Sequence, residues 1–195
     1  ISNDANYGGG IYLSHCDATI SHAVIADNTV TGDGCGILIE GDGNVSIDQT
    51  VFVGNSGPNG VVYFIASGIA ADITLDNLVI AENESDAIHA WMANPDDLVV
   101  MNTITWDNLG GCCGGQMYLY NGSNGNTSLP PEFLDTTAPS ATAWDVHLSA
   151  DSLIVDLGNA AVSDPDSSTS DPGAYGGPGA DGWDLDRDGY PEWWL

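Results

Sequence analysis

The chain has 195 residues, of which 28 are Asp or Glu and one is Lys or Arg, for a formal net charge of −27 at pH 7. Hydrophobic residues make up 43% of it, enough for one domain with a substantial core, so the charge does not indicate a disordered polyanion. A chain with so few cationic groups cannot neutralise phosphates, which argues against nucleic acid and anionic lipid as partners.

An acidic surface favours hard cations, chiefly Ca²⁺, and the alternative interpretation is simple solubility in a salty medium. No apolar stretch approaches the roughly 20 residues of a membrane-spanning helix. The sequence opens on Ile1-Ser2-Asn3 without an initiator Met or a signal sequence. We therefore expect a mature or trimmed part of a larger chain.

Short strands recur along the chain with a period of about 26 residues. Asparagines close four apolar segments at regular intervals, and Asn3 fits as a fifth member. These segments are 24–28, 51–55, 79–83 and 104–108, ending in Asn28, Asn55, Asn83 and Asn108. An alternating strand precedes each of them, at 18–21, 45–48, 73–76 and 98–101, and a third set of strands follows Gly-rich turns, at 10–13, 36–39, 61–64 and 87–90.

Three short strands per period with no helix between them predict an all-β fold, a right-handed parallel β-helix of about five coils with a C-terminal cap. Asparagines at the same corner of coils about 4.8 Å apart can pass amide hydrogen bonds along the stack. A leucine-rich repeat needs a leucine consensus, and a propeller needs about 40 residues per blade, so neither fits.

Two families share motifs with this sequence. Gly8-Gly9-Gly10-Ile11 and Phe52-x-x-Asn55 resemble the GGAI and FxxN repeats of polymorphic outer-membrane-protein passenger domains. The last third resembles the closing segment of large secreted bacterial proteins with pectate-lyase-like β-helices. The matching stretches are 131–135, 145–152, 156–159, 164–166 and 173–177. The resemblance implies an extracellular or bacterial cell-surface location, with coils at 1–129, a last coil and cap over the open end at 130–180, and an acidic tail at 181–195.

The tail carries Asp184, Asp186 and Asp188 followed by Gly189, with Glu192 further on. Carboxylates at positions 1, 3 and 5 with Gly at 6 match the first half of a calcium loop. Position 12 is Leu195, so the glutamate of an EF-hand is missing, and the motif resembles a truncated thrombospondin type 3 or dockerin loop. The sequence predicts Ca²⁺ as a cofactor here, and the alternative is an acidic solvated linker.

Two further groups of carboxylates occur. Asp164, Asp166 and Asp171 are best interpreted as a polar turn in the cap. Asp48 and Asp76 are predicted to be neighbours on adjacent coils, where a carboxylate pair can serve glycoside hydrolysis or hold a cation. With 28 acidic residues in the chain, simple exposure to water is the favoured interpretation of the pair.

A predicted column of ring side chains runs along one face. It contains Tyr12, Tyr63 and His89, with Trp91 beside it and Tyr118 and Tyr120 extending it. An exposed strip of this kind suits stacking on sugar rings, and the alternative is that some of these rings pack in the core.

The four cysteines are Cys16, Cys35, Cys112 and Cys113. Their spacing and the lack of suitably placed histidines do not favour a zinc site. The adjacent pair either forms a strained vicinal disulfide or remains as two ordinary thiols.

Parallel β-helices host polysaccharide lyases and hydrolases, but fold alone does not define function. A lyase acting on polyuronates needs basic groups, and the only one, Arg187, lies in the tail. The sequence therefore favours a calcium-stabilised structural, adhesive or glycan-binding module whose partner is a glycan or a surface protein. The alternative is a hydrolase of neutral glycans.

Overall fold

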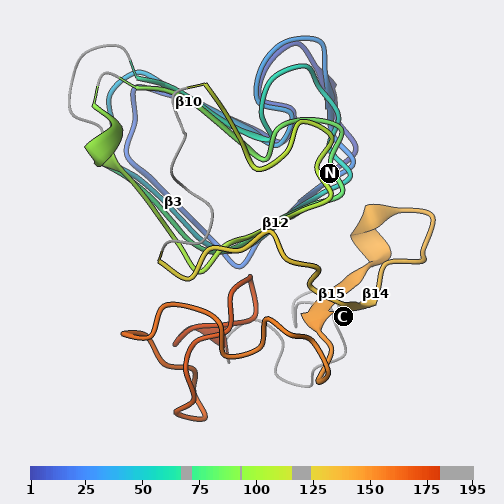
Figure 1. The fold of residues 1–195 in the computed structure, drawn as a ribbon. Helices are drawn as coiled ribbons and strands as arrows, with labels where there is room; N and C mark the ends of the chain where they lie inside the picture. Colours follow the sequence, from blue (N-terminus) through green and yellow to red (C-terminus); the bar gives the residue numbers. More distant parts are fainter. Residues whose placement is uncertain (67–71, 93, 116–123, 181–195) are drawn as a thin grey trace.

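The computed structural model describes residues 1–66, 72–92, 94–115 and 124–180. These residues form an all-β parallel β-solenoid of about four turns. The helical elements among them are two single 3₁₀ turns, η1 Pro95–Asp97 and η2 Ala141–Ala143. In the part of the chain that is described, no helix is long and apolar enough to cross a membrane. Viewed along the solenoid, successive coils overlie one another (Figure 1).

The first sheet contains five strands, contributed by successive passes of the chain. Its order is β13-β10-β8-β6-β2, and every neighbouring pair is parallel. The strands are β2 Ile11–Ser14, β6 Ile37–Glu40, β8 Val62–Ala66, β10 Ile88–Met92 and β13 Cys113–Gly115. The register places Tyr12, Leu38, Tyr63, His89 and Gly114 in one column.

The second sheet contains longer strands than the sequence pattern predicts. Its order is β11-β9-β7-β3, with β4 pairing β7 and β12 pairing β9. Its strands are β3 Ala18–Ser21, β4 Val24–Ala26, β7 Val45–Val53, β9 Ile73–Ala81, β11 Leu98–Met101 and β12 Ile104–Trp106. β7 and β9 each join two expected strands. A left-handed residue turns the corner inside each of them, Gln49 (φ 41°) in β7 and Asn77 (φ 51°) in β9, and pairing between the two strands continues on both sides of it. A short pair, β1 Asp4–Ala5 and β5 Thr29–Val30, lies beside them.

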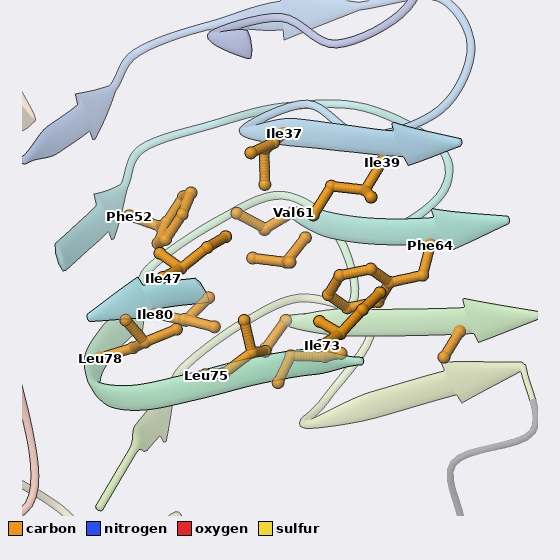
Figure 2. Close-up of a cluster of buried hydrophobic side chains, with 14 of the residues drawn as sticks. Ile37, Ile39, Ile47, Phe52, Val61, Phe64, Ile73, Leu75, Leu78 and Ile80 are labelled. Atoms are coloured by element: carbon orange, nitrogen blue, oxygen red, sulfur yellow. The ribbon is translucent and has the colours of Figure 1, made fainter. Parts of the chain in front are cut away.

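The core lies between the two sheets. Alternate side chains point inward, so that Ile47 and Leu75 meet Phe52 and Phe64, and all four are fully buried (Figure 2). Burying an aliphatic or aromatic side chain of this size stabilises the fold by about 1.5–3 kcal/mol. The apolar residues at alternate positions of these strands therefore form the solenoid interior.

A continuous amide ladder joins the coils at one corner. Asn3 Nδ2 donates to Asn28 Oδ1 at 2.9 Å, and Asn28 Nδ2 donates to Asn55 Oδ1 at 2.9 Å. Asn55 Nδ2 then donates to Asn83 Oδ1 at 3.0 Å, and Asn83 Nδ2 donates to Asn108 Oδ1 at 2.8 Å. This is the arrangement that the spacing of the asparagines predicts, with Asn3 as the fifth member.

The solenoid has about four turns rather than the predicted five. After β12 the chain adds β13 to the first sheet, and on the second sheet the described residues that follow contribute one isolated bridge, between Ile104 and Thr127. Pro130 and Pro131 follow at once. Proline has no N–H to donate to a neighbouring strand, so the coil cannot continue.

Among the described residues, the chain after the coils runs along the side of the solenoid. β14 Phe133–Asp135 and β15 Asp145–Leu148 form an antiparallel pair. The following residues, 149–180, contact a corner column made by His22, Gln49, Asn77 and Asn102, one from each successive coil. Figure 1 shows this orange and red segment outside the ring of coils, next to β12.

This lateral segment explains a second hydrophobic cluster. Val51 and Val53 point outward from β7 while Phe52 points inward, and both outward residues are buried. They pack with Val146, Ile154 and other buried side chains of the segment. The sheet is therefore covered on both faces at β4, β7, β9 and β12, which accounts for apolar runs without alternation in those strands.

Candidate functional site

The outward face of the first sheet carries the predicted ring side chains. We call Tyr12, Tyr63, His89 and Trp91 the aromatic row. The ring centroids of Tyr63 and His89 are 4.9 Å apart, and those of His89 and Trp91 are 5.9 Å apart. Tyr12 and Trp91 are 51% and 50% exposed, whereas Tyr63 is 7% exposed. The row therefore has a packed centre and two half-exposed rings, Tyr12 on the first coil and Trp91 on β10.

The register interrupts the row at one place. Leu38 lies between Tyr12 and Tyr63 and is 3% exposed. Tyr12 therefore does not stack on another ring of the row, and its hydroxyl instead donates to the Glu40 carboxylate of the next coil. This hydrogen bond is the main reason why the Tyr12 pKa is raised, because it favours the neutral phenol.

Hydrogen-bonding groups border the packed centre of the row. His89 Nδ1 lies 3.0 Å from Asp86 Oδ2, and Asn59 Nδ2 donates to Asp33 Oδ1 at 2.7 Å. Burial raises the pKa of Tyr63, and the charge of Asp33 adds to the effect. Asp33, Asn59 and Asp86 did not stand out in the sequence, although each follows a ladder asparagine by a few positions.

A glycine makes room for the histidine and its carboxylate. A Cβ on Gly114 would lie 2.4 Å from His89 Nδ1 and 2.2 Å from Asp86 Oδ2. Gly114 is the partner of His89 on the neighbouring strand. The Asp86–His89 pair therefore leans over the β13 backbone, where any other residue would displace it.

Asp48 and Asp76 are direct neighbours in the second sheet, as predicted. Burial raises the pKa of both carboxyl groups. Asp76 Oδ1 accepts from Asn102 Nδ2 at 3.1 Å, whereas Asp48 Oδ1 is buried without a hydrogen-bond partner among the described residues. Two carboxyls stacked in one column carry an electrostatic cost, and the column alone does not arrange an acid and a base around a glycosidic bond.

The carboxylates of the lateral segment form turns. Asp164 Oδ2 accepts from the Asp171 N–H at 2.9 Å, and Asp166 Oδ1 accepts from the Ser168 N–H at 2.9 Å. Burial raises the pKa of Asp164 and Asp171. These bonds are those of a polar turn. Within residues 1–66, 72–92, 94–115 and 124–180, no three His, Cys, Asp or Glu side chains are grouped to hold a metal ion.

Several predicted site residues are not among those that the structure describes. Asp184, Asp186, Asp188 and Glu192 of the predicted calcium loop lie outside the described residues, as do Tyr118 and Tyr120.

All four cysteines are free thiols. Cys16 is exposed and Cys35 is buried, and burial raises the pKa of Cys35 to about 12. Cys112 and Cys113 are partly exposed at the end of the first sheet that is nearest to His89.

The fold and the geometry define a parallel β-solenoid with an outward aromatic row. No protein-family model, curated protein or solved structure matches the chain.

Proposed function

We propose that this chain is an extracellular or cell-surface β-solenoid module that binds a neutral glycan along the aromatic row. The observation that carries the proposal is the exposure of Tyr12 and Trp91 on the same sheet face, on either side of the packed Tyr63–His89 pair. Aromatic rings offer a broad apolar surface to the C–H faces of sugars, and such anchors dominate binding when polar groups lie around them.

The solenoid suits an extended polymer. Coils repeat about every 4.8 Å along the axis, so a row that crosses several coils presents regularly spaced contacts. The Asp86–His89 and Asp33–Asn59 pairs supply donors and acceptors for hydroxyl groups beside the rings. A ligand lying along the axis would contact these groups coil by coil.

Charge selects the class of glycan. Asp33, Glu40 and Asp86 surround the row, and the whole chain carries a formal charge of −27. Polyuronates and sulfated glycans would be repelled by this field, whereas neutral sugars would not. The same field attracts Ca²⁺, and the predicted loop at Asp184, Asp186, Asp188 and Glu192 is the proposed calcium site that stabilises the module.

Affinity electrophoresis in gels containing neutral or acidic polysaccharides tests the proposal. We expect a panel of neutral polysaccharides to include one that retards the parent chain, while polyuronate gels leave its mobility unchanged. Trp91→Ala and Tyr12→Ala should restore free mobility, and Leu153→Ala, which alters a side chain 82% exposed in the lateral segment, should not. Retardation that is equal in the parent and both aromatic variants would refute the aromatic row as the binding site.

A further inference from the structure

Cys112 and Cys113 form a pair of adjacent thiols at the edge of the first sheet. β13 begins at Cys113 and pairs with β10, and the register sets Cys113 beside Ile88. Both thiols are free and partly exposed. Burial raises the Cys113 pKa, and the neighbouring Cys112 thiol raises it further.

The backbone around the pair can change shape. The sequence here is Gly110-Gly111-Cys112-Cys113-Gly114-Gly115, with two glycines on each side. Gly111 has φ 89°, and apart from its own chain neighbours no atom of the described residues lies within 4 Å of the position that a Cβ would occupy. Gly111 can therefore absorb backbone rotation next to Cys112 at little steric cost, whereas Gly110 and Gly114 lie close against Asp86.

A bond between neighbouring cysteines is strained. Consecutive Cα atoms are about 3.8 Å apart, whereas disulfides usually join Cα atoms about 4.4–6.8 Å apart. Strained and exposed disulfides have more oxidising potentials and are easily reduced again. Such a bond is suited to reversible chemistry and not to permanent stabilisation.

We propose that Cys112 and Cys113 are a reversible dithiol–disulfide site that exchanges with small disulfides. The Cys112 thiolate attacks one sulfur of the small disulfide, forming a mixed disulfide and releasing one small thiolate. The Cys113 sulfur then gives up its proton to water and attacks the Cys112 sulfur, releasing the second small thiol. The protein loses two hydrogen atoms in the net reaction, and the small disulfide is reduced to two thiols.

The order of attack follows from the surroundings of the two thiols. Cys113 packs against the hydrophobic core, and its raised pKa keeps it protonated, so it is the poorer first nucleophile. Cys112 carries the attack and Cys113 resolves the mixed disulfide.

Ring closure would also affect the sheet edge. The Ile88 N–H donates to the Cys112 carbonyl at 3.2 Å, and the Ala87 N–H donates to the Gly111 carbonyl at 3.0 Å. Twisting the peptide between the cysteines would weaken the first of these bonds. Amide hydrogen exchange at Ile88 should therefore be faster in the oxidised protein than in the reduced protein.

Peptide mapping by mass spectrometry tests the site in the full chain. The reduced protein is incubated with oxidised glutathione, the remaining thiols are alkylated in denaturant, and the digest is mapped. We expect the peptide containing both residues to be unalkylated and lighter by two hydrogen atoms, and dithiothreitol to restore its alkylation. Cys16→Ser should leave this result unchanged. In Cys113→Ser the reaction should stop at the mixed disulfide between glutathione and Cys112. A peptide alkylated at both cysteines, or linked to Cys16, would overturn the proposal.

Phenylarsine oxide provides a second readout, because trivalent arsenic bridges two neighbouring thiols. The parent chain should keep one bound arsenical in excess monothiol and release it to a dithiol. The Cys112→Ser variant should already lose the arsenical in monothiol. Equal retention by the Cys112→Ser variant would show that the two thiols do not act as a pair. Neither readout depends on glycan binding.

Discussion

The side-chain amide of Asn55 donates to Oδ1 of Asn83 at 3.0 Å, inside the solenoid and away from water. The same amide reaches the carbonyl of Ile25 at 2.9 Å, and Asn55 Oδ1 accepts from both the N–H and Nδ2 of Asn28. One side chain therefore satisfies buried polar groups of the coil before it and connects to the coil after it.

Asn55→Ala should destabilise the fold strongly. Truncation removes the acceptor of both the backbone and the side-chain donor of Asn28, and each unsatisfied buried group costs about 1–3 kcal/mol. We expect a loss of about 3 kcal/mol or more in the free energy of unfolding, measured by urea denaturation. Thr19→Ala, at an exposed position of β3, is the control and should change stability by less than about 0.5 kcal/mol. Equal midpoints for the two variants would contradict the structural role of the ladder.

A matched pair in the lateral segment tests whether that segment is an integral part of the fold. Ile154 is fully buried against the second sheet, and the adjacent Leu153 is 82% exposed. Ile154→Ala should cost about 2–5 kcal/mol through lost burial and the cavity left behind. Leu153→Ala should be nearly neutral. If thermal unfolding shows the same midpoint for both variants, the segment does not pack on the solenoid as described.

The fold was largely predictable because its determinants are local and repeated. Alternating residues such as Val45 and Ile47 mark an inward face, and asparagines at a fixed spacing mark a corner. The lateral segment could not be placed in this way, because its contacts with Gln49 and Asn77 join residues 94 to 127 positions apart. The apolar run at 51–53 was the available signal, since a strand apolar on both faces needs a cover on both.

The candidate site was predictable only in part. The repeat and its alternating pattern predict that Tyr12, Tyr63 and His89 occupy one column of a sheet, and the strand register confirms this. Their exposure could not be read from the pattern, because burial of Tyr63 and Leu38 depends on what surrounds the outward face. The polar partners Asp33, Asn59 and Asp86 come from turns whose shape no short motif specifies.

Stacked carboxyls predict a specific pH dependence. Burial raises the folded-state pKa of Asp48 above its unfolded value of about 3.9, so the charged form destabilises the fold at neutral pH. Stability from this group is therefore gained as pH falls through the folded pKa. Asp48→Asn imitates the protonated form and should raise the melting temperature at pH 7, with the advantage shrinking as pH approaches about 4.

Asp72→Asn is the matched control, since Asp72 is exposed on a neighbouring coil. Differential scanning calorimetry across this pH range measures both variants against the parent. An Asp48→Asn variant that is less stable than the parent at pH 7 would show that the ionised carboxylate contributes to the fold.

Calcium should stabilise the chain through the tail. Binding to the folded state alone adds about 2.7 kcal/mol when the free ion is present at 100 times its dissociation constant. We expect the melting temperature to be higher in Ca²⁺ than in EDTA, and Asp186→Asn to reduce that difference. Asp151→Asn, at an exposed position outside the loop, should retain it. An unchanged melting temperature in EDTA would reject the calcium site.

The aromatic row is the central functional claim, and the indole N–H signals of the six tryptophans test it most directly. Titration of the ¹⁵N-labelled chain with a neutral oligosaccharide, taken from a polysaccharide that retards the protein, should shift the Trp91 signal, assigned from the spectrum of Trp91→Phe. The Trp144 indole, which donates to the Ala138 carbonyl at 2.8 Å away from the row, should keep its position. A Trp91 signal that remains unmoved while the oligosaccharide binds would contradict the proposed site.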